Sequence, residues 1–193
     1  MTPLSLIKKN LLITGLPGVG KTTLIKKLSE ALKGLHPIGF YTEELREEGV
    51  RKGFGLIDLE GRRGLLSHQD IRSDYKVGQY QVDIKGFEDF LDSISFFNPS
   101  THLIIIDEIG KMECFSGRFK KLLKEILDSE KWVIATIALK GIGLIAEVKE
   151  RQDIKLFEIT KKNRDSLLKE ISDFVSQTHQ PDEGAQYSLV KWE

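Results

Sequence analysis

Gly15-Leu-Pro-Gly-Val-Gly-Lys-Thr22 follows the short apolar run at residues 11–13 and precedes a helical pattern of apolar residues. This order matches the phosphate-binding loop G-x-x-x-x-G-K-S/T, in which a glycine-rich turn joins a strand to a helix. Glycines let backbone N–H groups approach a chain of phosphates, and the following helix directs its positive end at the same charge. The stretch therefore predicts an α/β fold that binds a nucleoside triphosphate.

The polar side chains of this loop have predicted roles in binding the nucleotide and its metal ion. Lys21 is predicted to place its ammonium group against the β- and γ-phosphate oxygens, where it assists catalysis by neutralising charge. Thr22 is predicted to offer its hydroxyl to Mg²⁺. The full set of predicted nucleotide-binding residues in the loop is Gly15, Leu16, Pro17, Gly18, Val19, Gly20, Lys21, Thr22 and Thr23.

A second informative stretch is the run at residues 103–106, which is followed by Asp107 and Glu108. A continuous apolar run is typical of a parallel strand covered on both faces. In phosphate-loop enzymes the Asp at such a strand end holds Mg²⁺ opposite the loop Ser or Thr, so Asp107 is the second predicted metal ligand. Glu108 is the predicted base that activates water. The alternative is that both carboxylates cap the segment 109–113.

Two further polar residues near these carboxylates leave alternatives open. Lys111 either contacts phosphate, pairs with Glu108 or Glu113, or is a solvated surface lysine. Thr136, near the end of the neighbouring predicted strand, either senses the γ-phosphate or the attacking water, or is a buried threonine bonded to a backbone carbonyl. Cys114 is expected to serve packing, because no neighbouring base is evident in the sequence.

Apolar periodicity predicts alternating strands and helices on either side of a β-rich segment, and hence a three-layer α/β fold. We expect one phosphate-loop domain over residues 1–177, with an antiparallel β meander inserted at 38–84, and a C-terminal tail over 178–193. The expected parallel strands span 10–14, 103–106, 132–137 and 155–159. The expected meander strands span 39–43, 53–60, 64–67 and 80–84. The expected helices cover 24–32 (capped by Gly34), 87–97, 119–127, 142–150 and 164–176.

Composition excludes several classes of protein. The 193 residues include 29 Lys and Arg and 29 Asp and Glu, so no net charge favours nucleic acid or an anionic membrane surface. No apolar segment reaches membrane length, and the scattered histidines lack the spacing of metal ligands. The single cysteine permits no internal disulfide, which favours a cytoplasmic location. The sequence specifies no protein partner.

Several segments together resemble the cancer-related nucleoside-triphosphatase family, whose members also occur in thermophiles. They are residues 15–23 (GLPGVGKTT), 39–44 (GFYTEE), 76–80 (KVGQY), 106–113 (IDEIGKME) and 160–165 (TKKNRD), and the match runs from about residue 10 to residue 176. The chain departs from the family pattern at Cys114, where Leu is usual, and at Ala138, where Pro is usual.

This resemblance implies a RecA-like phosphate-loop fold with a mainly parallel sheet. It also implies slow, Mg²⁺-dependent removal of the γ-phosphate from several nucleoside triphosphates, ATP and GTP among them. Nucleotide binding is implied for Gly15 to Thr22 and for a second segment consisting of Ile104, Ile105, Ile106, Asp107, Glu108, Ile109, Gly110 and Lys111.

Two other functions share this loop. A small-molecule or nucleotide kinase needs an acceptor site and usually an arginine-bearing lid, for which Arg62 and Arg63 offer an apparent match. A nucleotide-dependent switch would couple weak hydrolysis to a partner protein. Spacing does not select an arginine finger among the arginines. The chain has no Asn-Lys-x-Asp guanine reader, so broad base specificity is expected.

Overall fold

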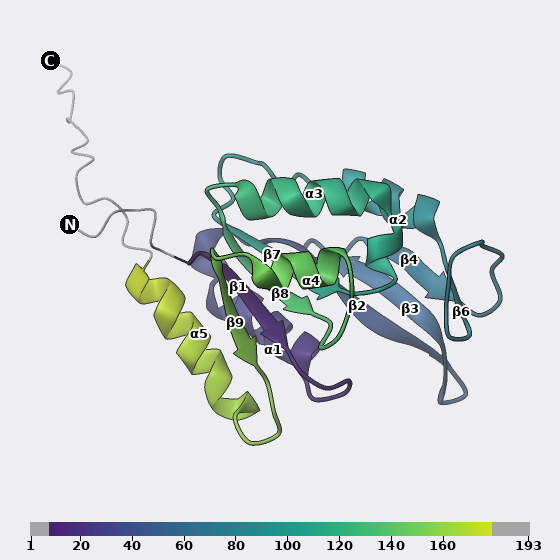
Figure 1. The fold of residues 1–193 in the computed structure, drawn as a ribbon, viewed down its shortest axis with the longest axis horizontal. Coiled ribbons are helices and arrows are strands. Elements are labelled where there is room, and N and C mark those ends of the chain that lie inside the picture. Colours follow the sequence, from purple (N-terminus) through teal and green to yellow (C-terminus); the bar gives the residue numbers. More distant parts are fainter. Residues whose placement is uncertain (1–7, 179–193) are drawn as a thin grey trace, which may run out of the picture.

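The computed structural model describes residues 8–178, and within them the centre of the molecule is a nine-stranded sheet (Figure 1). The strands lie in the order β5-β6-β4-β3-β2-β7-β8-β1-β9. Their bounds are β1 (Asn10–Thr14), β2 (Ile38–Glu47), β3 (Val50–Asp58), β4 (Arg63–His68), β5 (Lys76–Val77), β6 (Tyr80–Val82), β7 (Leu103–Ile109), β8 (Trp132–Ile137) and β9 (Ile154–Glu158).

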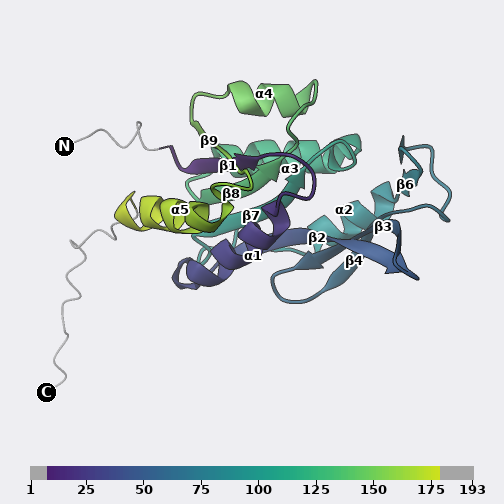
Figure 2. The ribbon, with the colours of Figure 1, turned by 90° about the horizontal axis from the view of Figure 1, so that it is seen from below.

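Helices cover both faces of this sheet (Figure 2). The α-helices are α1 (Lys21–Ala31), α2 (Ile84–Asp92), α3 (Gly117–Asp128), α4 (Leu144–Glu150) and α5 (Arg164–Thr178), and the short 3-10 helices are η2 (Lys33–Leu35) and η3 (Glu113–Phe115). Leu11 and Ile13 of β1 face one core, which α1 and α5 cover, and Leu12 faces the other core, which α2, α3 and α4 cover. This arrangement confirms the predicted three-layer α/β fold.

Strand direction divides the sheet into two halves. β2, β7, β8, β1 and β9 pair in parallel, and from β2 outward the pairs with β3, β4, β6 and β5 are antiparallel. The meander therefore extends one edge of the parallel sheet through β2. Because parallel strands end at the same edge, the segments that follow β1, β7, β8 and β9 come together there.

The predicted helix ends differ from the observed ones in two places. α1 ends at the cap residue Leu32, and the chain continues through η2, so Gly34 is no helix cap and the left-handed conformation falls at His36 (φ 48°). α2 ends at Asp92 and is followed by the cap residue Ser93, whose hydroxyl donates to the Phe90 carbonyl. Phe97 consequently lies beyond the helix and is 48% exposed, where the periodicity placed it on a buried face.

Other boundaries shift by a few residues. Ile84 begins α2 and does not end a strand, because the Asp83 side chain caps the helix by accepting from the Gly86 N–H. Ile142 precedes α4 and is 92% exposed. The two-residue strand β5 was not predicted. Of the predicted tail, Thr178 ends α5 and the rest lies outside the described residues.

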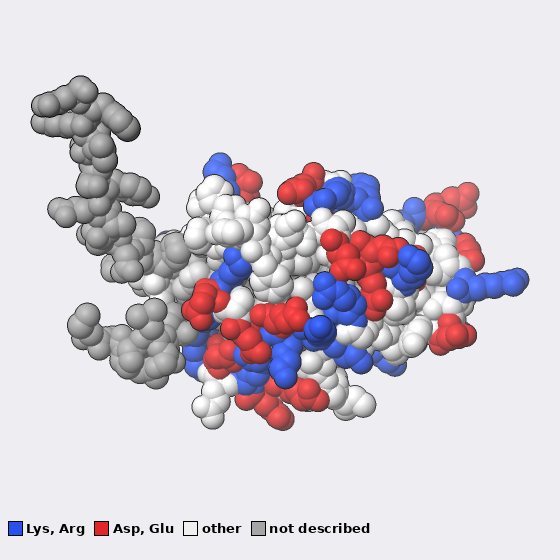
Figure 3. All heavy atoms as spheres, turned by 90° about the horizontal axis from the view of Figure 1, so that it is seen from above, with Lys and Arg blue, Asp and Glu red and all other residues white. Residues whose placement is uncertain are grey.

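The surface agrees with the balanced composition. Acidic and basic side chains are interspersed over the face shown in Figure 3. Within the part of the chain that the structure describes, no helix is long and apolar enough to cross a membrane.

The contact between β2 and β7 gives a test of the fold. Gly39 has φ +136°, and a Cβ atom there would lie 1.8 Å from the Ile105 carbonyl oxygen of β7. Gly39→Ala is expected to lower the free energy of unfolding by about 3 kcal/mol, because the backbone cannot yield without separating these strands. Denaturant unfolding measures the loss. Gly117→Ala, which meets no atom within 4 Å, should leave stability nearly unchanged; equal stability of both variants would contradict the prediction.

Candidate active site

The loop between β1 and α1 has the open shape that a phosphate chain requires. Gly18 (φ +72°) and Gly20 (φ +111°) adopt left-handed conformations, and a Cβ atom at either position would meet nothing within 4 Å. Gly15 differs, because a Cβ atom there would lie 2.5 Å from the Ile159 carbonyl oxygen. The start of the loop is thus packed closely against the segment that follows β9, and the later part of the loop is open.

Lys21 spans the loop and reaches the strand that carries the acidic pair. Its Nζ atom donates to the Gly15 carbonyl oxygen at 3.2 Å and lies 3.8 Å from Glu108 Oε2. Only 11% of the Lys21 side chain is exposed. The structure therefore brings the predicted lysine and the predicted base to the same place.

Asp107 is the point at which three elements of the site meet. Its carboxylate is 1% exposed. Thr22 of α1 donates to Oδ2 at 2.7 Å, and Thr136 of β8 donates to Oδ1 at 2.5 Å. Thr42 of β2 donates to Oδ2 over a longer distance of 3.5 Å. A buried carboxylate is held here by hydroxyl groups from α1 and from the two strands that flank β7.

These contacts resolve two of the alternatives left by the sequence. The Thr136 hydroxyl donates to the Asp107 carboxylate and not to a backbone carbonyl. The helix η3 has no side-chain cap, and α3 is capped by Ser116 through the Phe119 N–H. Asp107 and Glu108 therefore do not cap the segment that follows β7.

Glu108 is the more accessible member of the acidic pair. Its side chain is 33% exposed. Burial raises the pKa of the Glu108 carboxyl, the Lys21 ammonium opposes this rise, and the charge of Asp107 adds to it. A carboxylate with a raised pKa that still contacts solvent has the properties of a proton acceptor.

The remaining predicted residues separate into core and surface positions. The isoleucines of the second segment (Ile104, Ile105, Ile106 and Ile109) are at most 1% exposed and pack into the two cores, where they fix the strand that ends at Asp107. Lys111 is exposed, and among residues 8–178 it has no ion-pair partner, so the pairings considered for it are not formed. Val19 is buried, whereas Leu16, Pro17 and Thr23 are exposed.

Two residues at the site were not assigned a part from the sequence. Thr42 follows the segment of β2 that pairs with β7. Because the two strands are parallel, Thr42 lies beside the end of β7, near Asp107. Glu113 is 4% exposed and lies close to Glu108: a Cβ atom on Gly110 would lie 2.8 Å from Glu113 Oε2 and 3.0 Å from Glu108 Oε1. Because Gly110 has no side chain, the carboxyl groups of Glu108 and Glu113 can both lie beside its Cα atom.

Burial dominates the chemistry of Glu113 and of its neighbour Cys114. Burial raises the pKa of the Glu113 carboxyl to about 8, even though the backbone N–H groups of Glu113 and Gly110 donate to it. Burial likewise raises the pKa of the Cys114 thiol to about 11. Cys114 and Ala138, the two departures from the family pattern, both pack at the edge of the same core, as expected for packing residues.

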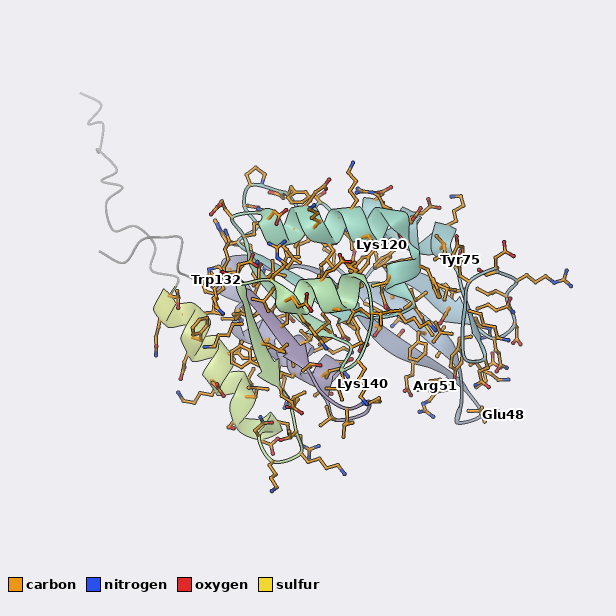
Figure 4. The ribbon with its side chains drawn as sticks, in the orientation of Figure 1. Glu48, Arg51, Tyr75, Lys120, Trp132 and Lys140 are labelled. Carbon is orange, nitrogen blue, oxygen red and sulfur yellow. The ribbon has the colours of Figure 1, made fainter. Side chains whose placement is uncertain are left out.

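The loop after β8 borders the same edge of the sheet. Lys149 of α4 donates to the carbonyl oxygens of Ala138 and Leu139, at 2.6 and 2.8 Å. Lys140 extends from this loop at the lower edge of the molecule (Figure 4), where the parallel strands end. The loop is therefore tied to α4 through its backbone and presents Lys140 outward.

The residues where α1 meets the end of β7 fit a magnesium site whose remaining ligands would be phosphate oxygens and water. Within residues 8–178, no group of three or more His, Cys, Asp and Glu side chains is arranged to hold a metal ion. The Thr22 hydroxyl and the Asp107 carboxylate, whose oxygens are 2.7 Å apart, form a smaller oxygen donor set. Mg²⁺ is commonly bound by one or two carboxylates together with phosphate oxygens and water, so this donor set suits it.

Known proteins share both this sequence and this fold. A family model described as NTPase matches residues 10–172. The chain belongs to this NTPase family. The nucleoside-triphosphatase THEP1 of Thermotoga sp. (strain RQ2) is 49% identical over 162 residues, which cover 83% of this chain and 92% of the relative. The cancer-related nucleoside-triphosphatase of Homo sapiens is 40% identical over 179 residues, covering 84% and 94%.

Solved structures of NTPase family members have the same architecture. The crystal structure of THEP1 from the hyperthermophile Aquifex aeolicus matches with a TM-score of 0.78 at 38% identity, covering 89% of this chain and 99% of the other. The solution structure of the human cancer-related nucleoside triphosphatase matches with a TM-score of 0.78 at 39% identity, again over 89% and 99%. The family resemblance found in the sequence is confirmed.

The buried Glu113 carboxyl predicts a pH dependence of stability. Between about 4.5 and about 8 the folded chain keeps this proton while the unfolded chain loses it. The free energy of unfolding should therefore fall as the pH rises through this range, by up to about 1.4 kcal/mol per pH unit. Below a pH of about 4.5 the stabilisation that the protonated Glu113 provides should be fully present. Urea unfolding of the wild type and of Glu113→Gln measures this.

The glutamine variant should lose that part of the slope, because an amide does not titrate in this range. Glu147→Gln, on the exposed side of α4, serves as the control and should keep the wild-type slope. Identical slopes for the wild type and Glu113→Gln would show that Glu113 is already ionised in the folded protein.

Proposed function

We propose that this protein is a Mg²⁺-dependent nucleoside triphosphatase, which converts a nucleoside triphosphate and water to the diphosphate and phosphate. The observation that carries the proposal is the position of the acidic pair of β7 against the phosphate loop, with Asp107 bonded to Thr22 and Glu108 beside Lys21. The relatives that are named nucleoside-triphosphatases support the same reaction.

Substrate binding rests on the loop. The open space beside Gly18 and Gly20 suits phosphate oxygens, which backbone N–H groups can then contact. Lys21 exchanges its contact with the Gly15 carbonyl for the β- and γ-phosphate oxygens, a stronger interaction because the acceptor is charged. The exposed Thr23, Leu16 and Pro17 border the bound phosphates.

Thr22 and Asp107 are the residues that would hold Mg²⁺, together with phosphate oxygens and water. When bound, the ion neutralises the charge that develops on the transferred phosphoryl group. Thr136 and Thr42 keep the Asp107 carboxylate turned toward Thr22, since each donates to one of its oxygens. Hydroxyl contacts of this kind orient a metal-binding carboxylate.

Glu108 accepts a proton from the attacking water. As the water oxygen bonds to the γ-phosphorus, the bond from phosphorus to the bridging β–γ oxygen breaks, and the diphosphate leaves with the electron pair. The raised pKa of Glu108 makes it a better proton acceptor than an ordinary carboxylate. Lys21, 3.8 Å from Glu108 Oε2, stabilises both the carboxylate and the phosphate charge.

Three further properties belong to the proposal. Broad base specificity is supported by a loop that recognises phosphates and by the absence of an Asn-Lys-x-Asp guanine reader from the sequence. Slow turnover is carried over from the family resemblance, and no arginine is assigned to the transition state. A cytoplasmic location is supported by the single cysteine.

Glu108→Gln tests the assigned base. The amide cannot accept the proton but nearly preserves the shape, so phosphate release from ATP, GTP, CTP and UTP should fall at least about a hundredfold while nucleotide affinity is retained. A phosphate-release assay with Mg²⁺ and calorimetric binding measure the two properties. Glu125→Gln, on the exposed side of α3, is the matched control and should hydrolyse normally. Undiminished turnover in Glu108→Gln would refute the assignment.

The same assay separates the alternative functions. Phosphate release from purified protein without an acceptor supports hydrolysis, whereas release that requires a second substrate would make the protein a kinase. Single-turnover rates with and without cell extract test the switch alternative, because a large stimulation would point to a partner protein.

Thr136→Val tests whether the buried threonine orients Asp107. Valine has the same shape but no hydroxyl, so the Mg²⁺ concentration needed for half-maximal ADP binding should rise about tenfold or more. Calorimetry measures ADP binding across a Mg²⁺ titration, and affinity without Mg²⁺ should stay unchanged. Thr136→Ser should restore the wild-type midpoint. A similar loss with and without Mg²⁺ would assign Thr136 to folding alone.

A further inference from the structure

The sheet order gives a bound nucleotide a direction. β7, which carries Asp107 and Glu108, marks the γ-phosphate end, and β1 leads into the phosphate loop. Across the sheet the order is β7-β8-β1-β9, so β9 lies on the opposite side of the loop from the acidic pair. A nucleotide with its terminal phosphate at β7 therefore has its sugar and base on the side of β9.

We propose that the segment between β9 and α5 forms the nucleoside-binding part of the site, with Lys161 and Lys162 as the residues that contact the base or ribose. The proposal rests on the function proposed above, because it takes the orientation of the nucleotide from the assignment of Asp107 and Glu108. Residues 160–163 of this segment lie in the stretch 160–165, to which the proposed phosphate chemistry assigns no role.

The first support is the direct contact between this segment and the start of the phosphate loop. Ile159 donates its N–H to the Thr14 carbonyl oxygen at 2.8 Å. A Cβ atom on Gly15 would lie 2.5 Å from the Ile159 carbonyl oxygen and 2.8 Å from its Cγ2 atom. The backbones of the two segments are therefore in contact where the phosphate loop begins.

The second support is that one side chain fixes the shape of the segment. Asn163 Oδ1 accepts from the Thr160 N–H at 2.7 Å and from the Thr160 hydroxyl at 3.0 Å. Asn163 Nδ2 donates to the Glu158 carbonyl oxygen at 2.8 Å. These bonds hold the turn between β9 and α5 and leave the side chains between Thr160 and Asn163 on the outside.

The third support is the chemistry of the two lysines that this turn presents. Lys161 and Lys162 are exposed, and in the described part of the chain neither forms an ion pair with a carboxylate. An ammonium group donates hydrogen bonds and accepts none, and the common bases and ribose all offer oxygen or nitrogen acceptors. Lysine stems also pack against flat apolar surfaces. Recognition of this kind selects a nucleoside without selecting one base.

The test compares ligands that share the phosphates and differ in the nucleoside. Calorimetric affinities of ATP, GTP, CTP and UTP are measured with Mg²⁺ beside that of inorganic tripolyphosphate, which has no sugar or base. The double variant Lys161→Ala with Lys162→Ala should bind all the nucleotides roughly tenfold more weakly and should bind tripolyphosphate as the wild type does. The matched control is Lys120→Ala with Lys121→Ala, an exposed adjacent pair on α3 (Lys120 is labelled in Figure 4), which should change neither affinity.

Two results would overturn the inference. An equal loss for tripolyphosphate would show that the lysines serve the phosphates, and unchanged nucleotide affinity would show that the nucleoside lies elsewhere. Amide NMR signals give an independent measure: ADP should shift the signals of residues 160–163, and tripolyphosphate should not. These are binding measurements, so absence of hydrolysis would defeat the proposed function while the nucleoside site could still be found.

Discussion

The site depends on one interaction, the bonding of the Asp107 carboxylate by hydroxyl groups. A carboxylate that is 1% exposed would be costly to bury without such partners, and here Thr22 and Thr136 each donate to one of its oxygens. The contact joins α1, β7 and β8, so the phosphate loop and the acidic strand are held at a fixed separation. Glu108 and Lys21 acquire their positions from that same arrangement.

Much of this architecture could be predicted because it has a strong local cause. The continuous apolar runs at β1, β7 and β8 predict buried parallel strands, and parallel strands bring their carboxyl ends to one edge. The glycines at 15, 18 and 20 identify the turn between strand and helix. Motif spacing alone therefore predicts that Thr22 lies near Asp107, as the structure shows.

The parts that were missed depend on contacts between distant segments. Thr42 approaches Asp107 only because β2 pairs with β7 in a register that no single strand specifies. Glu113 is buried because the chain turns back at Gly110, which no periodicity records. Helix ends were misjudged where a side chain stops the helix, as Ser93 does for α2, since apolar spacing continues past the stop.

β2 belongs to both halves of the sheet, so one strand joins the meander to the candidate site. Over Ile38 to Phe40 it is bonded to β7, and from Phe40 to Glu47 it is bonded to β3. Thr42 lies where the first partner ends and the second continues. A single unbroken backbone thus connects β3 of the meander to the hydroxyl group beside Asp107, so the strand that carries the antiparallel half of the sheet also positions a group of the site.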